Sequence, residues 1–186
     1  MTHKNIHGKY QKGKTLFKTD RLLAREWTPL DARNLYLLNT DPEVLKYTGD
    51  RPFSTEDEAR IFLENYKDYK LHGFGRWLLL RRDDGACIGW CGLKMHDEGW
   101  VDLGFRLMRS FWGQGYATEA AKASLEVGFH RFDLPEIIGR AAAKNTASHR
   151  VLEKLKMTFW QQGSFEGIPH AVYYRITKEA YHKNYG

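Results

Sequence analysis

The sequence of 186 residues contains only two cysteines, Cys87 and Cys91, which is too few for a disulfide scaffold. They lie in an apolar stretch, and no second pair of ligands completes a zinc site. Free cysteine is among the residue types that proteins bury most often. We therefore expect two small core residues and no bound metal.

Long apolar runs are also missing. None approaches the roughly 20 residues that span a membrane, and MTHKNIHGKY at the start has no apolar core of a secretory signal. Together with the low cysteine content, these absences favour a cytoplasmic protein without membrane association.

Acidic residues are absent from residues 1–18. The whole chain has a formal net charge of +6, and five of these positive charges come from this segment, which leaves +1 for residues 19–186. We expect a basic, flexible tail over 1–18 and a single domain over 19–186. A nucleic-acid partner is not expected, although a weak electrostatic contact through the tail stays open. The five lysines are Lys4, Lys9, Lys12, Lys14 and Lys18.

Periodicity and turn residues divide the rest of the chain into alternating elements. Helix 114–131 connects strands 100–108 and 136–143, so these two strands must be parallel, whereas hairpins join the strands before them. We expect an α/β (α+β mixed) fold in the order β-α-α-β-β-β-α-β-α-β-β, with helices on both faces of a mixed central sheet. The predicted strands are 22–27, 76–82, 86–95, 100–108, 136–143, 159–165 and 170–177; the predicted helices are 28–41, 54–71, 114–131 and 146–156, with 41–49 a short helical turn or an irregular link.

The stretch RSFWGQGYATEA (109–120) places a glycine loop between a predicted strand and a predicted helix. It lacks the Gly-Lys-Ser/Thr ending of a P-loop, and its spacing and neighbouring acids do not fit a dinucleotide fingerprint. What remains is the general anion site at a helix N-terminus, where free N–H groups and the helix dipole attract phosphate.

Three segments together resemble the GNAT N-acetyltransferase superfamily. LGFRLMRSFWGQGYATEA (103–120) resembles its acetyl-CoA signature, in the branch of the ribosomal-protein N-terminal (alanine/serine) acetyltransferases. KNTASHRVLEKLKM (144–157) is similar to a second family segment, and TDRLLAREWTPLDA (19–32) is similar to the first strand and helix. The resemblance covers about residues 19–180. It implies a GNAT-like fold, acetyl-CoA as cosubstrate, and acetyl transfer to a primary amine.

The resemblance also implies roles for individual residues. Asn145 would contact the cofactor, and Ser148 would protonate the leaving thiolate. Lys156 stands where the family usually has a glycine in a left-handed helix cap; a lysine in that conformation costs about 1 kcal/mol, or else the cap is built differently. The amide near Leu107 would polarise the thioester carbonyl. Phe105, Arg106 and Leu107 would pair with pantetheine, and Trp112, Gly113, Gln114, Gly115, Tyr116, Ala117 and Thr118 would form the pyrophosphate loop.

The general base has several candidates. Asp102 and Glu166 are the preferred ones, with Glu98, His96 and His170 as alternatives. Asp102 could instead be a structural carboxylate, and Ser148 an ordinary serine of a first helical turn. We expect direct attack by the amine in a ternary complex, since neither cysteine has a nucleophile setting.

The acceptor and the assembly stay open. A protein N-terminus and a small amine are both compatible with the resemblance, while the lack of a dense acid cluster disfavours a strongly polycationic acceptor. The chain could be a monomer or a homodimer. The alternative function is a CoA-binding regulatory module without turnover, which would keep residues 112–118 but lack a usable base.

Overall fold

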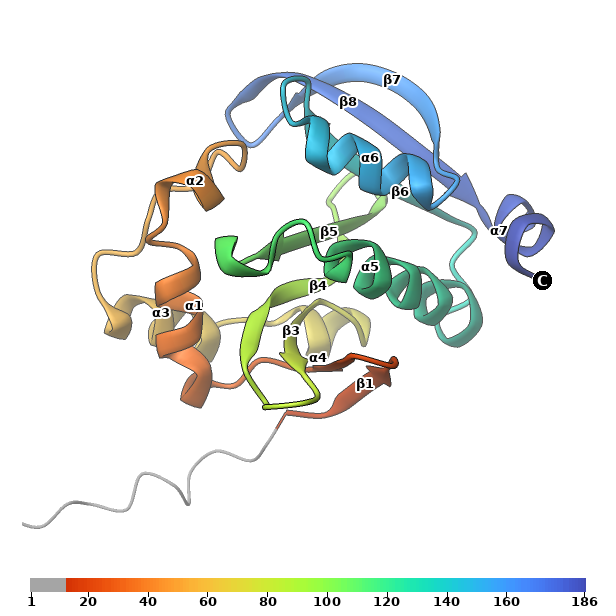
Figure 1. Cartoon of the computed structure of the whole chain (residues 1–186). Helices are drawn as coiled ribbons and strands as arrows, with labels where there is room; N and C mark the ends of the chain where they lie inside the picture. Colours follow the sequence, from red (N-terminus) through yellow and green to blue (C-terminus); the bar gives the residue numbers. More distant parts are fainter. Residues whose placement is uncertain (1–12) are drawn as a thin grey trace, which may run out of the picture.

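Eight strands form one mixed sheet in the order β1-β2-β3-β4-β5-β6-β8-β7 in the computed structural model, which describes residues 13–186 (Figure 1). β5 and β6 are parallel, and the other neighbouring pairs are antiparallel. The strands are β1 (Thr15–Lys18), β2 (Leu22–Arg25), β3 (Arg76–Arg81), β4 (Cys87–Met95), β5 (Val101–Leu107), β6 (Glu136–Ala142), β7 (Thr158–Phe165) and β8 (Ile168–Thr177).

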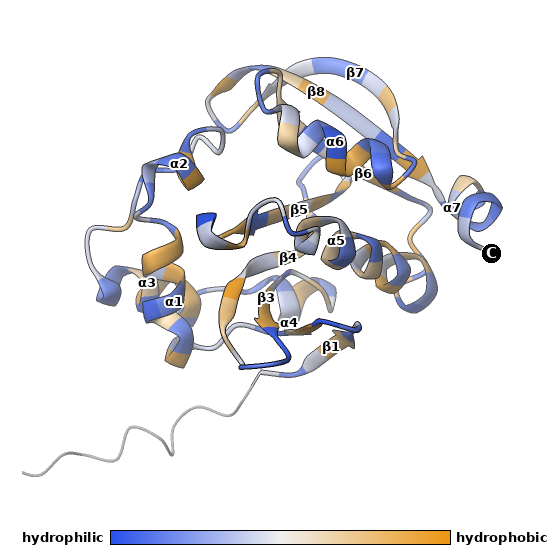
Figure 2. Cartoon of the chain, viewed as in Figure 1, coloured by the Kyte–Doolittle hydropathy of each residue, from blue (hydrophilic) through white to orange (hydrophobic). Residues whose placement is uncertain are grey.

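Helices cover both faces of this sheet, as predicted. On β3, Trp77 and Leu79 face the core beneath α5, whereas Leu78 faces the core beneath α1 and α3. The central strands β3 to β5 are hydrophobic over much of their length (Figure 2). The helices are α1 (Ala32–Leu38), α2 (Pro42–Leu45), α3 (Glu56–Glu64), α4 (Asp68–His72), α5 (Tyr116–Glu126), α6 (Thr146–Lys154) and α7 (Lys178–Tyr185); α5 continues in a π-helical turn, Val127–Arg131.

The predicted tail over 1–18 is wrong for residues 15–18, which form β1. This strand pairs with β2, and Phe17 packs edge-on against Trp77 with ring centroids 6.0 Å apart. The charge count covered the two adjacent apolar residues of this segment, Leu16 and Phe17, which are half-buried. Residues 1–12 of the predicted tail, and the weak electrostatic contact left open for them, lie outside the described residues.

The predicted helix 54–71 is two helices, α3 and α4, separated at residues 65–67. The side-chain amide of Asn65 donates to the carbonyl of Ile61 and ends α3. The hydroxyl of Tyr66 accepts the backbone N–H of Arg76, and that of Tyr69 donates to the carbonyl of the same residue. These bonds to the start of β3 break the helical path. Ile61 and Phe62, on α3, are exposed.

Two further elements differ from the prediction. The segment 28–41 opens with a 3-10 turn, Pro29–Asp31, because the Asp31 carboxylate accepts from Arg25 and from the N–H of Thr28. The helix α7 was not predicted: Thr177 caps its start, and its Tyr181 packs on Phe129 at a centroid distance of 4.7 Å. In residues 13–186, no helix combines the length and apolar character needed to cross a membrane.

Candidate functional site

The parallel strands β5 and β6 separate soon after they meet. Their ladder has two residue pairs, the second joining Leu103 to Gly139, although β5 continues to Leu107. β5 remains paired with β4 on its other side along its whole length. From Gly104 onward, the edge of β5 that faces β6 therefore has backbone groups free for a ligand or water.

The register of β5 against β4 determines which groups point into this gap. The N–H of Met108 donates to the carbonyl of Ile88 at 2.9 Å. Because backbone directions alternate along a strand, the N–H and C=O groups of Phe105 and Leu107 point away from β4 and toward β6. The Leu107 carbonyl already accepts from Nε1 of Trp112 at 2.8 Å. The N–H groups of Phe105 and Leu107 remain as donors in the gap.

A cleft of about 620 Å³ occupies the gap, a size typical of small-molecule sites. Residues from both faces of the sheet line it, so the cleft passes from one face toward the other. On the α5 side its lining includes Gly113, Gly115, Thr118, Asn145, Ser148 and Arg150; on the opposite side it includes Tyr47, Arg76, Trp90, Arg140, Phe165 and Glu166.

Two glycines shape the loop between β5 and α5. Gly113 and Gly115 have φ angles of 74° and 82°, in the left-handed region where other residues are strained. α5 begins at Tyr116, so the N–H groups of its first turn lack acceptors within the helix. Of the residues predicted for the phosphate loop, all but Gln114 line the cleft. The Gln114 side chain instead donates to the carbonyl of Ser110.

The contacts that hold this loop in place were not predicted from the sequence. Glu119 accepts from Thr19 Oγ1 at 2.6 Å and from Nε of Arg21 at 2.7 Å. Arg21 also donates to the Gln114 carbonyl at 3.0 Å and lies over the ring of Tyr116. The β1–β2 turn is thus fixed to the start of α5, and a guanidinium lies beside the predicted anion site. The sequence signal for these contacts is Glu119, the acid of the Ala-Thr-Glu motif. A phosphate loop by itself does not require an acidic side chain at this position.

The start of α6 borders the same cleft. The Asn145 side chain caps the helix by accepting the N–H of Ser148 at 3.2 Å. Both residues line the cleft, and the Ser148 side chain is half-buried. Asn145 would therefore have to contact the cofactor while its side chain also caps α6. The Ser148 hydroxyl makes none of the described hydrogen bonds.

On the sheet face opposite α5, Asp102 is buried between two arginines. Its Oδ1 accepts from Arg76 Nη2 at 2.6 Å, and its Oδ2 accepts from Arg140 Nη2 at 3.1 Å. His96 Nε2 lies 3.2 Å from Oδ1. Burial alone would raise the pKa of Asp102, but the adjacent Arg76, His96 and Arg140 outweigh it and hold the pKa well below its usual range.

These contacts argue against the predicted role of Asp102 as the base. A carboxylate held ionised far below neutral pH has little tendency to take a proton from an amine. The alternative in the sequence analysis, a structural carboxylate, fits its position. Sequence reasoning missed both arginines, because their meeting requires β3, β5 and β6 to lie next to Asp102 in space.

Gly104 makes room for one of these arginines. A Cβ on Gly104 would lie 2.6 Å from Cζ of Arg76. Trp90 lies between two guanidiniums, with Arg76 5.1 Å and Arg106 5.3 Å from its ring centroid. Arg106 donates to Asn39 Oδ1 at 2.6 Å, so its side chain ties β5 to the end of α1, and the residue also lines the cleft.

Two segments distant in the sequence meet at this end of the cleft. A Cβ on Gly49, in the loop after α2, would lie 1.9 Å from the carbonyl oxygen of Glu166, in the β7–β8 turn. The absence of a side chain at Gly49 therefore permits a close backbone contact. Figure 1 shows α2 beside this turn. We call the contact between Gly49 and Glu166 the strap.

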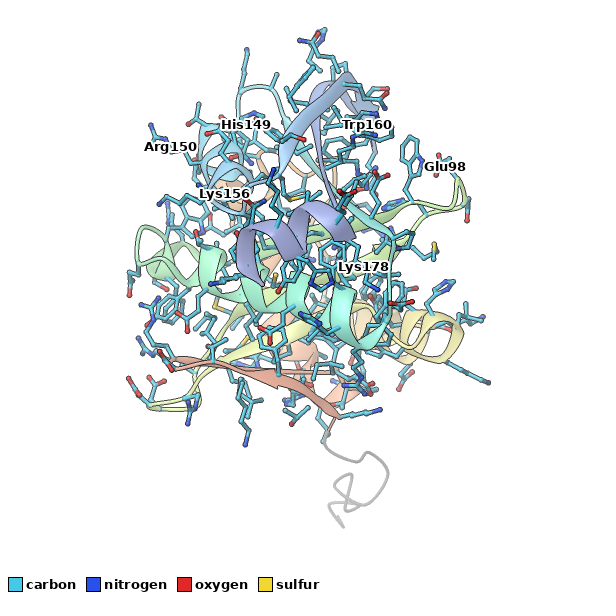
Figure 3. All side chains as sticks on the ribbon, turned by 90° about the vertical axis from the view of Figure 1, so that its right-hand side faces the viewer. Glu98, His149, Arg150, Lys156, Trp160 and Lys178 are labelled. Carbon is cyan, nitrogen blue, oxygen red and sulfur yellow. The ribbon has the colours of Figure 1, made fainter. Side chains whose placement is uncertain are left out.

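Among the other base candidates, Glu166 is the one that lines the cleft. Its side chain is 46% exposed, and Oε1 lies 3.6 Å from Arg140 and 3.7 Å from Lys94. Glu98 lies at the tip of the β4–β5 turn, on the opposite side of the view from Arg150 of the cleft (Figure 3). His170 is exposed and does not line the cleft, and His96 belongs to the Asp102 network.

The two cysteines lie outside the cleft lining. Cys91 is fully buried and Cys87 is half-buried, which confirms the core prediction for Cys91. Burial raises the pKa of both thiols to about 12. Neither is a thiolate at neutral pH, so neither has the reactivity of a nucleophile.

A known family combines this fold with this kind of cleft. Residues 21–158 match the family model described as the acetyltransferase (GNAT) domain. The uncharacterized N-acetyltransferase p20 of Bacillus licheniformis is 33% identical over 148 residues, covering 78% of this chain and 82% of the relative. The chain belongs to the GNAT acetyltransferase family and is an N-acetyltransferase, an acyltransferase of a family that uses acetyl-CoA.

Solved structures agree with this assignment. An acetyltransferase of the GNAT family from Bacillus anthracis matches with a TM-score of 0.76 and 27% identity, covering 89% of this chain and 99% of that one. The ribosomal-protein-S5-alanine acetyltransferase from Vibrio fischeri matches with a TM-score of 0.76 over 90% and 98% of the chains, at 13% identity. The second match shows the fold alone. The predicted GNAT fold and family are confirmed.

Proposed function

We propose that this protein transfers the acetyl group of acetyl-CoA directly to a primary amine while both substrates occupy the cleft. The observation that carries the proposal is the opening of β5 from β6 beside the free N–H groups of α5. When bound, acetyl-CoA supplies an acetyl group activated as a thioester. The acceptor is a protein N-terminus or a small amine; the name of the Vibrio fischeri protein gives an alanine of ribosomal protein S5 as the acceptor of that enzyme.

The donor side of the cleft fits the cosubstrate. The amides of Gln114 to Thr118 would hold the pyrophosphate at the start of α5, where dipole and free N–H groups favour an anion. Trp112 and Gly113 set the entry to this loop. The outward backbone groups of Phe105 to Leu107 would bind pantetheine as an added strand does. Asn145 borders the same channel from α6.

The chemical roles fall to side chains and amides at the junction of the two faces. The Leu107 N–H, free in the gap, would donate to the carbonyl oxygen on which negative charge develops. Ser148 would protonate the leaving sulfur. Glu166, half-exposed at the acceptor end, would take the proton of the amine directly or through water. Asp102 would position Arg76 and Arg140.

Substitution of Gly115 tests the donor site. Gly115→Glu puts a carboxylate where the pyrophosphate would lie, so we expect acetyl-CoA affinity, measured by calorimetry, to fall at least about 100-fold. Gly85→Glu is the matched control: Gly85 also has a positive φ of 70°, and a Cβ added there would meet no atom within 4 Å. Unchanged affinity in Gly115→Glu, with the control intact, would show that the phosphate site is elsewhere.

Substitution of Glu166 tests the base. We expect Glu166→Gln to lower kcat/KM by about 100-fold, within the range for general-base removal, at unchanged acetyl-CoA affinity. The control is Glu98→Gln, which alters an exposed turn between strands outside the cleft. Equal rates for the two variants would exclude Glu166 as the base. If the native protein binds acetyl-CoA but releases no thiol with any amine, the result would instead support the alternative function, a CoA-binding regulatory module without turnover.

A further inference from the structure

One nitrogen of the Arg140 guanidinium, Nη1, makes no hydrogen bond among the described residues. Its Nε and Nη2 donate to Asp102, and Nη2 also lies 3.0 Å from His96 Nε2. Among the hydrogen bonds of the described residues, none involves Nη1. Yet the side chain is only 10% exposed, lines the cleft, and stacks on the Phe165 ring at 4.8 Å.

Two buried guanidiniums share one buried carboxylate at this site. Arg76 and Arg140 both pair with Asp102, whereas the second carboxylate of the lining, Glu166, is 46% exposed and lies 3.6 Å from Arg140 and 3.7 Å from Lys94. Asp102 remains ionised, so it offsets one of the two buried guanidiniums. Glu166 lies beyond hydrogen-bond distance of both its partners. A largely buried positive charge without a full partner is unfavourable, and a ligand anion would relieve it.

From this geometry we infer that the acceptor amine also carries a carboxylate, and that Arg140, with Arg76 beside it, binds this carboxylate. The inference rests on the proposed function and deepens it by naming the acceptor class: amino acids, or amines with an acidic group close to the amine. Guanidinium is suited to this task because its planar N–H groups match the two oxygens of a carboxylate.

The remaining walls agree with a small zwitterionic acceptor. The guanidinium of Arg76 lies over the indole of Trp90, and that of Arg140 lies over the ring of Phe165. Glu166 Oε1 lies 3.6 Å from Arg140 Nη2 in the same lining, so one compact molecule can place its ammonium near Glu166 and its carboxylate near Arg140. The strap limits the room at this end.

The experiment compares acceptors that differ in the carboxylate alone. Thiol release from acetyl-CoA is measured with α-amino acids and ω-amino acids of increasing length, each paired with its carboxamide, and with polyamines and peptide amides as acceptors lacking a carboxylate. We expect at least one acid to exceed its carboxamide in kcat/KM by about tenfold or more. This comparison uses the native chain and needs no variant.

Two variants locate the effect. Arg140→Lys keeps one positive charge near Asp102 but loses the planar fork, so the acid-to-carboxamide ratio should fall about tenfold at unchanged acetyl-CoA affinity. Arg175→Lys is the matched control, since Arg175 lies on β8 outside the cleft lining and is 46% exposed. It should keep the native ratio.

Each other outcome has a defined meaning. Thiol release with carboxamides, polyamines or peptide amides at rates equal to or above those of the acids overturns the carboxylate inference and leaves the proposed transfer intact. A native ratio retained in Arg140→Lys also overturns it. If the chain binds acetyl-CoA but no acceptor of either kind releases thiol, the proposed transfer fails, and the inference fails with it.

Discussion

Lys156 adopts the conformation that the family resemblance expects of a glycine. It follows the last turn of α6 with φ at 60°. Its N–H donates to the Glu153 carbonyl at 2.9 Å, and the N–H of Met157 donates to the Leu152 carbonyl at 3.2 Å. These two bonds are the Schellman pattern that ends a helix with a left-handed residue. The left-handed cap is therefore present, and the backbone at Lys156 is strained because the residue carries a Cβ.

Replacing this residue should stabilise the fold. We expect Lys156→Gly to raise the free energy of unfolding by about 1 kcal/mol, because glycine adopts the left-handed conformation without steric cost. Urea unfolding followed by circular dichroism measures the change. Lys154→Gly, inside the last turn of α6, should do the opposite by about 1 kcal/mol. A loss of stability in Lys156→Gly would mean that the side chain makes compensating contacts.

Asp102 should make the stability of the fold depend on pH. Its pKa is lower in the folded protein than in the unfolded chain, so its stabilising effect is complete above the ordinary aspartate pKa near 4 and is lost as pH falls toward the folded value. Asp102→Asn should reduce the free energy of unfolding at pH 7 by about 3 kcal/mol. The deficit should shrink below pH 4.

Unfolding curves of both proteins at several pH values between 7 and 3 check this prediction. Asp83→Asn, in the exposed turn after β3, serves as the control and should track the native chain throughout. A deficit that is constant over the whole pH range would show that Asp102 acts through shape and hydrogen bonding rather than through its charge.

Elements defined by local signals were predictable from the sequence. Apolar stretches between turn residues located β3, β4 and β5 within a residue or two of their ends. The phosphate loop was also local, because its glycines, its strand and its helix are contiguous. In contrast, the break after α3 depends on Tyr66 and Tyr69 binding the start of β3, and β1 depends on Phe17 reaching Trp77. No periodicity within those segments encodes these partners.

The strap between the loop after α2 and the β7–β8 turn offers a test at this scale. Gly49→Ala would place a Cβ 1.9 Å from the Glu166 carbonyl oxygen, so the two segments must separate. We expect the KM of the acceptor to rise about tenfold while acetyl-CoA affinity stays native, because the phosphate loop lies at the other end of the cleft. Steady-state kinetics and calorimetry measure the two quantities.

Gly167→Ala is the matched control for backbone strain. Gly167 lies in the same turn with φ at 81°, but a Cβ added there would meet no atom within 4 Å. If both variants raise the KM equally, strain in the turn rather than the strap is responsible. If neither does, the strap does not shape the acceptor end.

The proposed acceptor end of the cleft is formed by residues from several strands across the sheet. Arg76, Asp102 and Arg140 come from β3, β5 and β6, and Glu166 comes from the β7–β8 turn. Two of these four residues, Asp102 and Glu166, were predicted from the sequence, because a carboxylate is a natural candidate for the general base. The two arginines sit in apolar strands with no motif around them, and their meeting depends on strand order and on the missing side chain of Gly104.

The arrangement of the two ends predicts the kinetic mechanism. The phosphate loop borders the cleft on the α5 face, whereas the arginine pair borders it on the opposite face, so donor and acceptor can bind together. Covalent relay through a cysteine is disfavoured, since both thiols lie outside the cleft lining and burial raises their pKa to about 12. Initial-rate plots at varied acetyl-CoA and acceptor should therefore give intersecting lines.

The double variant Cys87→Ala, Cys91→Ala should keep the kcat of the native chain, provided that circular dichroism shows it folded. Parallel lines, or a burst of thiol in the absence of acceptor, would contradict the ternary complex and require an acetylated residue that mass spectrometry could locate.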